Sequence, residues 1–193
     1  MKIIVFTGNN IKEREGLLSW YNIADSALSN TGKPFYLPDD SGEVTAAIGL
    51  VLKISKLGKY IHPRFASRYY NQWAPAVHFC LKGLMDTLYA NHLPVAPALS
   101  FDRSLMVGDF INISENPEKI KIGLKINDES SVELNLNNFK YSAENLLHEF
   151  SKSNTVKMGD LLIPAISIAN KIRIGDILDV TVNDETAFTV KVK

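Results

Sequence analysis

One uninterrupted apolar stretch dominates the hydrophobic pattern of the chain. Residues 43–54 are almost all apolar, are rich in strand-favouring side chains, lack proline and follow the turn residues 39–42. A run of this kind is typical of a strand that is buried on both faces. We therefore predict a central strand over residues 43–54. Polar side chains on such a strand would point into a pocket, but the positions that could carry them hold Ala47 and Gly49.

Shorter patterns predict the elements around this strand. Upstream we expect a strand at 2–6, a short helix at 11–20, and a long irregular excursion at 22–40, where Gly32, Pro34 and Pro38 interrupt any regular pattern. Downstream we expect a helix that begins at Pro63 and runs to 70, a buried strand at 75–81, a helix at 83–91, and an extended segment at 94–102 that Pro94 and Pro97 impose.

The C-terminal half predicts two similar hairpins and one helix. Residues 120–126 and 131–136 flank one polar turn, residues 178–182 and 187–192 flank another, and these segments alternate apolar with polar positions. Between the hairpins, Ser142 caps a helix with a periodic apolar face. Gly-Asp pairs at 108–109, 159–160 and 175–176 indicate sharp bends into strands. We predict a β-rich α+β fold, a roll of mixed β-sheets with a few short helices.

Length and composition limit the number of domains and the classes of partner. The 193 residues suffice for a single domain, with 1–42 as an N-terminal strand, helix and excursion and 43–193 as the core roll. Lys plus Arg and Asp plus Glu both number 21, so we expect no nucleic-acid or membrane partner. The apolar N-terminus is too short for a signal peptide, and no apolar run reaches the ~20 residues of a membrane span, which favours a cytoplasmic protein.

The residue pattern by itself supports no definite chemistry. The sequence has no glycine-rich phosphate loop, and its 4 histidines are scattered. His78 lies on a predicted buried strand, where a hydrogen-bonded structural role is favoured over a role as ligand or base. Cys80 is expected to be a small core residue, and with His78 it only loosely suggests a nucleophile and its base. The basic and aromatic residues of segment 64–70 are explained by packing at least as well as by contact with RNA or a ligand.

Short motifs in collinear order nevertheless carry a resemblance over nearly the whole chain. They lie at residues 1–10, 33–39, 50–54, 58–61, 66–70, 101–104, 107–111, 155–161 and 174–176. Together they resemble the fumarylacetoacetate hydrolase family, in particular its short bacterial members described as 2-hydroxyhepta-2,4-diene-1,7-dioate isomerases. The resemblance implies a β-roll around a pocket, commonly a homodimer, that acts on acylpyruvate-like keto acids. It also implies a Mg²⁺ or Mn²⁺ ion that chelates the substrate and stabilises its enolate.

The resemblance implies where the catalytic groups of the family should fall. Its Glu-x-Glu metal ligands fall on Ala47 and Gly49, its third carboxylate on His78, and its lysine on Leu99 or, with a one-residue shift, Ala98. A hard cation without carboxylates loses most of the charge that offsets its dehydration. We therefore expect no metal and no other cofactor, and an apolar filling of the former pocket.

Other pocket positions of the family have changed as well. Its Arg-Asn-Tyr motif falls on Gly8-Asn9-Asn10, its water-activating histidine near Glu13, its Lys-Pro on Ile23-Ala24, and its Gly-Thr-Pro-x-Gly loop on residues 165–169. The candidates for a residual pocket are Asn9, Glu13, His78 and Ser100.

Two classes of function follow from these positions. The favoured one is a catalytically degenerate family member, a pseudoenzyme, with a binding or assembly role. It would pair with itself as a homodimer, pair with an active paralogue, or sense a small-molecule ligand. The alternative is a divergent hydrolase, isomerase or decarboxylase of acylpyruvate-like keto acids that uses residues outside these positions.

Overall fold

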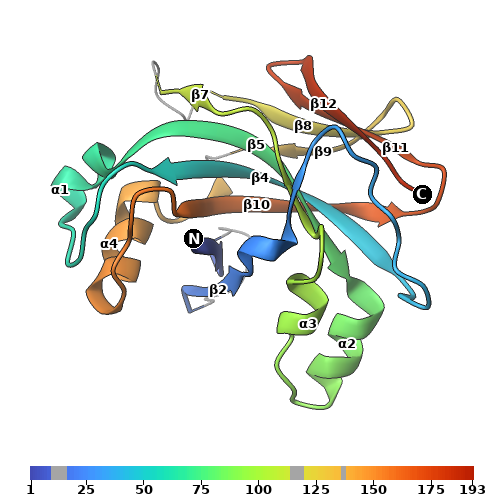
Figure 1. The fold of residues 1–193 in the computed structure, drawn as a ribbon, viewed down its shortest axis with the longest axis horizontal. Helices are drawn as coiled ribbons and strands as arrows, with labels where there is room; N and C mark the ends of the chain where they lie inside the picture. The colour runs from blue at the N-terminus through green and yellow to red at the C-terminus, as the bar shows by residue number, and fades with distance from the viewer. Residues whose placement is uncertain (10–16, 114–119, 136–137) are drawn as a thin grey trace.

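A long, curled β-sheet forms the body of the protein (Figure 1). The computed structural model describes residues 1–9, 17–113, 120–135 and 138–193. Strands of the sheet follow the order β2-β1-β10-β4-β5-β6-β3, and β7 pairs with β5. Their bounds are β1 (Ile3–Thr7), β2 (Ser19–Ile23), β3 (Leu28–Asn30), β4 (Val44–Ile54), β5 (Tyr70–Leu81), β6 (Leu105–Val107), β7 (Ile111–Asn112) and β10 (Leu161–Ile172).

The two ends of the strand order are neighbours in sequence, and this curls the sheet into a roll. Residues 24–27, which include the short helix η1 (Asp25–Ala27), are all that separates β2 from β3. The Ala24 N–H donates to Ser100 Oγ at 2.9 Å and ties this connection to the segment after helix α3 (Ala96–Leu99). One face of the sheet therefore lines the interior of the roll. That face carries an apolar cluster from several strands: Ile3, Val5, Val51, Ala76, Leu105, Leu161 and Ile163.

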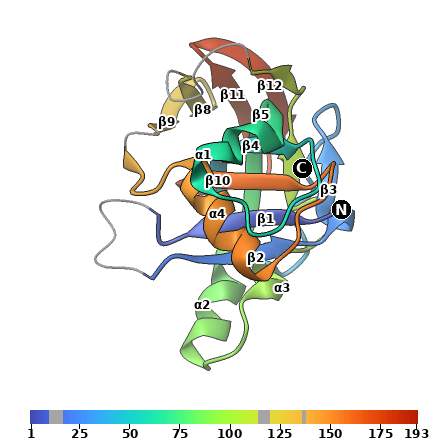
Figure 2. The same ribbon diagram turned by 90° about the vertical axis from the view of Figure 1, so that its left-hand side faces the viewer.

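A second sheet and a helix cover the outer face of the roll (Figure 2). The sheet has the order β12-β11-β8-β9, with β8 (Ile122–Ile126), β9 (Glu129–Leu134), β11 (Ile177–Val182) and β12 (Glu185–Lys191). Its buried residues and those of α4 (Ala143–Ser153) form one core with the even-numbered residues of β4, such as Ile48 and Leu52. Because β4 is buried on both faces, the prediction for its apolar sequence is confirmed.

The predicted hairpins and two of the four predicted helices are confirmed, with shifted ends. The helix predicted at 83–91 is α2 (Lys82–Ala90). Helix α4 begins directly after its predicted cap, Ser142, whose Oγ accepts a hydrogen bond from the Asn145 N–H at 3.4 Å. Both hairpin turns are tighter than predicted. They consist of Asn127-Asp128 and Asn183-Asp184, with φ between 50° and 69°. Positive φ at both positions is typical of the two-residue turns that match the twist of paired strands.

Three predictions around these elements were wrong. Segment 94–102 contains α3, because a proline in the first turn of a helix needs no donor. Trp20 and the start of the predicted excursion at 22–40 belong to β2, and that excursion also holds η1 and β3. Trp20 packs on Phe6 and Phe150 at 6.0 and 5.6 Å between ring centroids. The rest of the helix predicted at 11–20 lies mainly outside the described residues.

Residues 63–70 and 75–81 also differ from their predicted boundaries. The predicted helix is split into α1 (Pro63–Ala66) and η2 (Ser67–Tyr69), and β5 already begins at Tyr70. Pro75 therefore lies inside a long strand. It is accommodated because β7 pairs with residues 72 and 73 while β6 pairs with 76–78, and the Pro75 carbonyl accepts from the Gly108 N–H between them at 2.8 Å. Within the described residues, no helix is long and apolar enough to span a membrane.

The stacked pair Phe35–Phe79, with 3.7 Å between ring centroids and both side chains buried, gives a test of this core. Phe79→Ala should lower the free energy of unfolding by about 3–5 kcal/mol, because it leaves a cavity and a ring without its partner. Urea denaturation followed by circular dichroism measures the change. The control Tyr89→Ala, at a side chain that is 78% exposed, should stay within about 0.5 kcal/mol of wild type. Equal effects of the two substitutions would contradict this packing.

Candidate functional site

The interior of the roll brings together Ala47, Gly49, His78 and the main chain of Leu99, the positions at which the resemblance predicts the family's catalytic groups. The antiparallel register of β4 and β5 pairs Ala47 with His78 and Gly49 with Ala76, and residues paired in this way share a face of the sheet. Leu99, at the end of α3, joins them through its main chain, because its carbonyl oxygen lies 2.7 Å from His78 Nε2. The side chains around this point come from β4, β5, β10 and β2, which makes the end of the roll interior the candidate site.

His78 is the central polar group of this site, and both of its ring nitrogens have partners. Its side chain is 3% exposed. The contact with the Leu99 carbonyl requires a proton on Nε2, so Nδ1 is the acceptor for the Tyr21 hydroxyl at 3.5 Å. Burial lowers the pKa of His78 to about 4, partly opposed by the hydrogen bond to the Leu99 carbonyl. At neutral pH the imidazole is therefore uncharged.

Tyr21 reaches His78 from the opposite wall of the roll. It lies on β2, where it pairs with Val5, and its ring centroid is 6.1 Å from that of His78. Burial raises the pKa of the Tyr21 phenol, and the neighbouring Cys80 raises it further. Sequence reasoning missed Tyr21 because it assigned this segment to a helix end and an excursion. The strand-favouring residues Trp20, Tyr21 and Ile23 are the signal that could have identified a strand.

Cys80 lies beyond His78 on the same face of β5. It is buried, as predicted, and its Sγ lies 3.7 Å from Met85 Sδ. Burial raises the pKa of the Cys80 thiol, which Lys82 only partly offsets. A thiol with a raised pKa is a weak nucleophile at neutral pH, which argues against the His78–Cys80 pair as nucleophile and base.

The donor set of this site does not fit a hard cation. Ala47 and Gly49 offer no side-chain oxygen, and both nitrogens of His78 are engaged. Within the described part of the chain, no group of three or more His, Cys, Asp or Glu side chains could hold a metal ion. A Cβ atom at Gly49 would lie 3.2 Å from both the Ala165 carbonyl oxygen and Ile163 Cγ2. These neighbours on β10 would therefore have to shift by a few tenths of an ångström to admit a side chain at position 49.

The other candidate residues have structural contacts. Asn9 is buried; its Nδ2 donates to the carbonyls of Tyr141 (3.2 Å) and Pro164 (3.0 Å), and its Oδ1 accepts from the Tyr141 N–H (2.8 Å). Asn9 also borders a cavity of about 350 Å³ beside β10, which includes Ile166 and Ile168, the partners of Gly49 and Ala47. Ser100 accepts the hydrogen bond that closes the roll. Glu13 lies outside the described residues.

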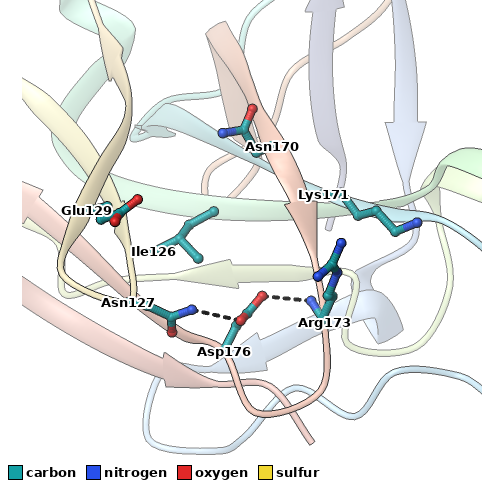
Figure 3. Close-up of a pocket in the computed structure, with 7 residues that line it drawn as sticks. All are labelled: Ile126, Asn127, Glu129, Asn170, Lys171, Arg173 and Asp176. Atoms are coloured by element: carbon teal, nitrogen blue, oxygen red, sulfur yellow. Dashed lines mark hydrogen bonds between the residues drawn. The ribbon is translucent and has the colours of Figure 1, made fainter.

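A second cavity, of about 340 Å³, lies where the outer sheet meets the end of β10 (Figure 3). Its floor is a turn that Asp176 stabilises by accepting from Asn127 Nδ2 (2.9 Å) and the Arg173 N–H (2.8 Å). Asp160 fixes the preceding Gly-Asp turn in the same way, through the Lys157 N–H. These contacts confirm that the aspartates of both turns are turn formers. Because Glu129 and Arg173 line this cavity with opposite charges, the cavity favours neither an anionic nor a cationic ligand strongly.

The buried neutral imidazole makes stability depend on pH. His78 has a folded pKa of about 4, below its ordinary value of 6.5, so the unfolded chain binds more protons as pH falls between these values. The stability contributed by the neutral ring is complete above pH 6.5 and is lost towards pH 4, by about 3 kcal/mol. His78→Gln keeps a donor to Leu99 but cannot titrate, and should flatten the profile. Urea unfolding at several pH values measures this; the exposed His92→Asn control should keep the wild-type slope.

One protein family model matches most of the chain. The fumarylacetoacetate (FAA) hydrolase C-terminal model matches residues 8–185. Among curated proteins, the mitochondrial oxaloacetate tautomerase of Caenorhabditis elegans is 23% identical over 157 residues, which cover 80% of this chain and 73% of that protein.

Similar solved structures include a fumarylacetoacetate hydrolase family protein from Yersinia pestis, with a TM-score of 0.90, 20% identity, and coverage of 100% of this chain and 92% of that one. Another is the fumarylpyruvate hydrolase of Pseudomonas aeruginosa in complex with Mn²⁺ and pyruvate (TM-score 0.88, 16% identity, 100% and 89% coverage). A third is the 2-hydroxyhepta-2,4-diene-1,7-dioate isomerase of Mycobacterium marinum (TM-score 0.84, 16% identity, 99% and 73% coverage). At these identities the structures show a shared fold. Because the family model spans residues 8–185, as the sequence motifs predicted, the chain belongs to the fumarylacetoacetate hydrolase family.

Proposed function

We propose that this family member has given up hard-cation catalysis and has a non-catalytic binding or assembly role. The observation that carries the proposal is the environment of His78. Its imidazole lies where the resemblance predicts a metal-binding carboxylate. The ring is uncharged and uses both nitrogens in contacts with Tyr21 and Leu99. A Mg²⁺ or Mn²⁺ ion prefers several oxygen ligands with negative charge, and Ala47 and Gly49 supply none.

The small apolar residues Ala47 and Gly49, at positions where the resemblance predicts metal ligands, favour close packing of the strands over binding of a metal ion. A buried carboxylate without a cation would be costly, whereas alanine and glycine let the neighbouring strand approach closely. Ile163 and the main chain of β10 lie against Gly49 at contact distance. This close approach supports a roll interior that contributes stability to the domain.

A family member that does not catalyse a reaction would act by binding another molecule. The partners that we propose are a second copy of the chain or an active paralogue in the cytoplasm, with a small-molecule ligand as a further option. The interior of the roll offers a ligand chiefly apolar side chains together with the Tyr21–His78 pair.

The Tyr21–His78 contact also favours a second candidate, a tautomerase or isomerase that works without a metal. A keto–enol interconversion only moves a proton between carbon and oxygen, and a phenol beside a neutral imidazole offers an acid and a base. The names of relatives, oxaloacetate tautomerase and fumarylpyruvate hydrolase, suggest keto acids as substrates. A histidine with a pKa of about 4 is a weak base at neutral pH, however, which is why we place this candidate second.

Metal titration tests the first proposal. Calorimetry with Mg²⁺ or Mn²⁺ should give no binding heat with the wild-type chain, because the carboxylates are absent. The pair Ala47→Glu with His78→Asp should gain weak Mn²⁺ affinity, about millimolar, because two carboxylates then face one point. A third change, Gly49→Glu, would require β10 to shift by a few tenths of an ångström and is omitted from this first variant. Leu99→Lys is not needed for the metal.

The matched control replaces the same residues with uncharged isosteres, Ala47→Gln with His78→Asn, and should not bind the ion. Tight stoichiometric binding by the wild-type chain would refute the proposal. A folded carboxylate pair that ignores Mn²⁺ would show that these positions do not correspond to the family's ligands.

The tautomerase candidate makes a separate prediction about oxaloacetate and acylpyruvates. If it holds, the purified chain should accelerate their keto–enol interconversion in the presence of a chelator, followed by the ultraviolet absorbance of the enol. Tyr21→Phe should then lower the rate at least tenfold, because it removes the acidic proton and keeps the ring. Tyr89→Phe, at an exposed ring, is the control. No acceleration above the uncatalysed rate would leave the binding role as the supported function.

A further inference from the structure

One end of the molecule exposes large apolar side chains. This end, which we call the tip, consists of residues 55–69 and 155–158 beside α4, and it faces the viewer in Figure 2. Leu57 and Tyr60 are each 69% exposed, Phe65 is 49% exposed and Met158 is 78% exposed. Side chains of this size and exposure leave apolar area in water that a binding partner could cover.

Hydrogen bonds join the tip to the rest of the fold, so this exposure is a property of the folded chain. Gly58 and Val156 exchange two main-chain hydrogen bonds, of 3.0 and 2.9 Å. The Tyr60 N–H donates to the Ser151 carbonyl at 2.9 Å, and His148 Nδ1 contacts the Ile61 carbonyl at 2.7 Å. These contacts fasten the segment to α4 while its apolar side chains project away.

Positive charge surrounds the apolar side chains. The sequence has no Asp or Glu between Glu43 and Asp86, and the exposed cations of the tip are Lys56, Lys59, Arg64, Arg68 and Lys157. None of these cations takes part in an ion pair within the described residues. Two of them lie instead over exposed rings: Lys59 Nζ is 5.2 Å from the Tyr60 centroid, and Arg68 Cζ is 5.2 Å from the Phe65 centroid.

The carboxylates of α4 and of Asp160, which follows the tip in sequence, are already engaged. Glu144 accepts from the Tyr70 hydroxyl, Glu149 pairs with Lys152 at 2.7 Å, and the buried Asp160 pairs with Lys2 at 3.4 Å. The tip therefore has unpaired positive charge although the whole chain is neutral.

The backbone conformation of Tyr60 is strained. Its φ is 54°, in the left-handed region, where a glycine would be unstrained and a bulky residue is disfavoured. Its ring nevertheless projects into solvent and fills no core position. A strained, exposed aromatic residue that folding does not require is a feature that function can explain.

We propose that the tip binds an anionic membrane surface peripherally. Tyr60, Phe65, Leu57 and Met158 would enter the headgroup boundary, and the unpaired lysines and arginines would contact lipid phosphates. A nucleic acid fits less well, because Leu57 and Met158 can neither stack on bases nor contact phosphates. An acidic protein would need a groove that matches these projecting side chains. A lipid surface needs no such groove. The neutral net charge predicted no membrane partner; the local charge of the tip revises that expectation, and the inference holds whether or not the roll interior is catalytic.

Vesicle co-sedimentation of the full chain tests this proposal. At low salt the chain should bind vesicles of phosphatidylcholine with about one third phosphatidylglycerol, and should bind pure phosphatidylcholine at least tenfold more weakly. Neutralising the tip with Lys56→Gln, Lys59→Gln, Arg64→Gln and Arg68→Gln should reduce binding at least tenfold. The matched control, Lys121→Gln, Lys125→Gln, Lys191→Gln and Lys193→Gln, removes equal charge from the outer sheet and the C-terminus and should change binding less than twofold.

The variant Tyr60→Gly distinguishes a role of the Tyr60 ring in vesicle binding from a role in the stability of the fold. It relieves the left-handed backbone strain, so the melting temperature should stay equal or rise while vesicle binding falls. Several outcomes would overturn the proposal: no binding to anionic vesicles, equal loss in the tip and control variants, or a single-stranded RNA 20-mer that displaces the vesicles and loses affinity in the same tip variant. Self-association that depends on the same tip residues, seen by light scattering, would also overturn it, because a second copy would then be the occupant.

Discussion

Burial of β4 on both faces is the constraint on which the rest of the structure depends. The even-numbered residues of this strand face the outer sheet and α4, and the odd-numbered ones face the interior of the roll. A strand in this position can carry charge only where a partner offsets it. With Ala47 and Gly49 on the inner face, no offset is needed, and β5 and β10 can pair with β4 along most of its length.

The same constraint explains how much of the structure the sequence could predict. A two-sided apolar strand, a capped amphipathic helix and alternating hairpins each follow from local periodicity, and these elements were predicted correctly. The closure of the roll could not be predicted in this way. It depends on the short link from β2 to β3 and on the Ala24–Ser100 hydrogen bond, which joins residues far apart in sequence. No pattern within one window of sequence contains that information.

The candidate site could also be predicted only in part. The family resemblance placed Ala47, Gly49, His78 and Leu99 at related positions, and the pairing of β4 with β5 brings them together. Tyr21 was missed because it reaches His78 from a strand that the sequence assigned to irregular structure. The hydrogen bonds of Asn9 show a second limit, because the sequence motif that predicted a pocket residue here does not reveal that its side chain joins main-chain segments.

The close approach of β10 to Gly49 has a consequence for the history of the chain. Because Ile163 Cγ2 and the Ala165 carbonyl oxygen lie 3.2 Å from the place of a Cβ atom, any larger residue at position 49 requires these neighbours to shift by a few tenths of an ångström. Single substitutions in the opposite direction meet no such barrier. Position 49 is therefore easier to convert to glycine than to convert back, which favours retention of Gly49 in descendants of this sequence.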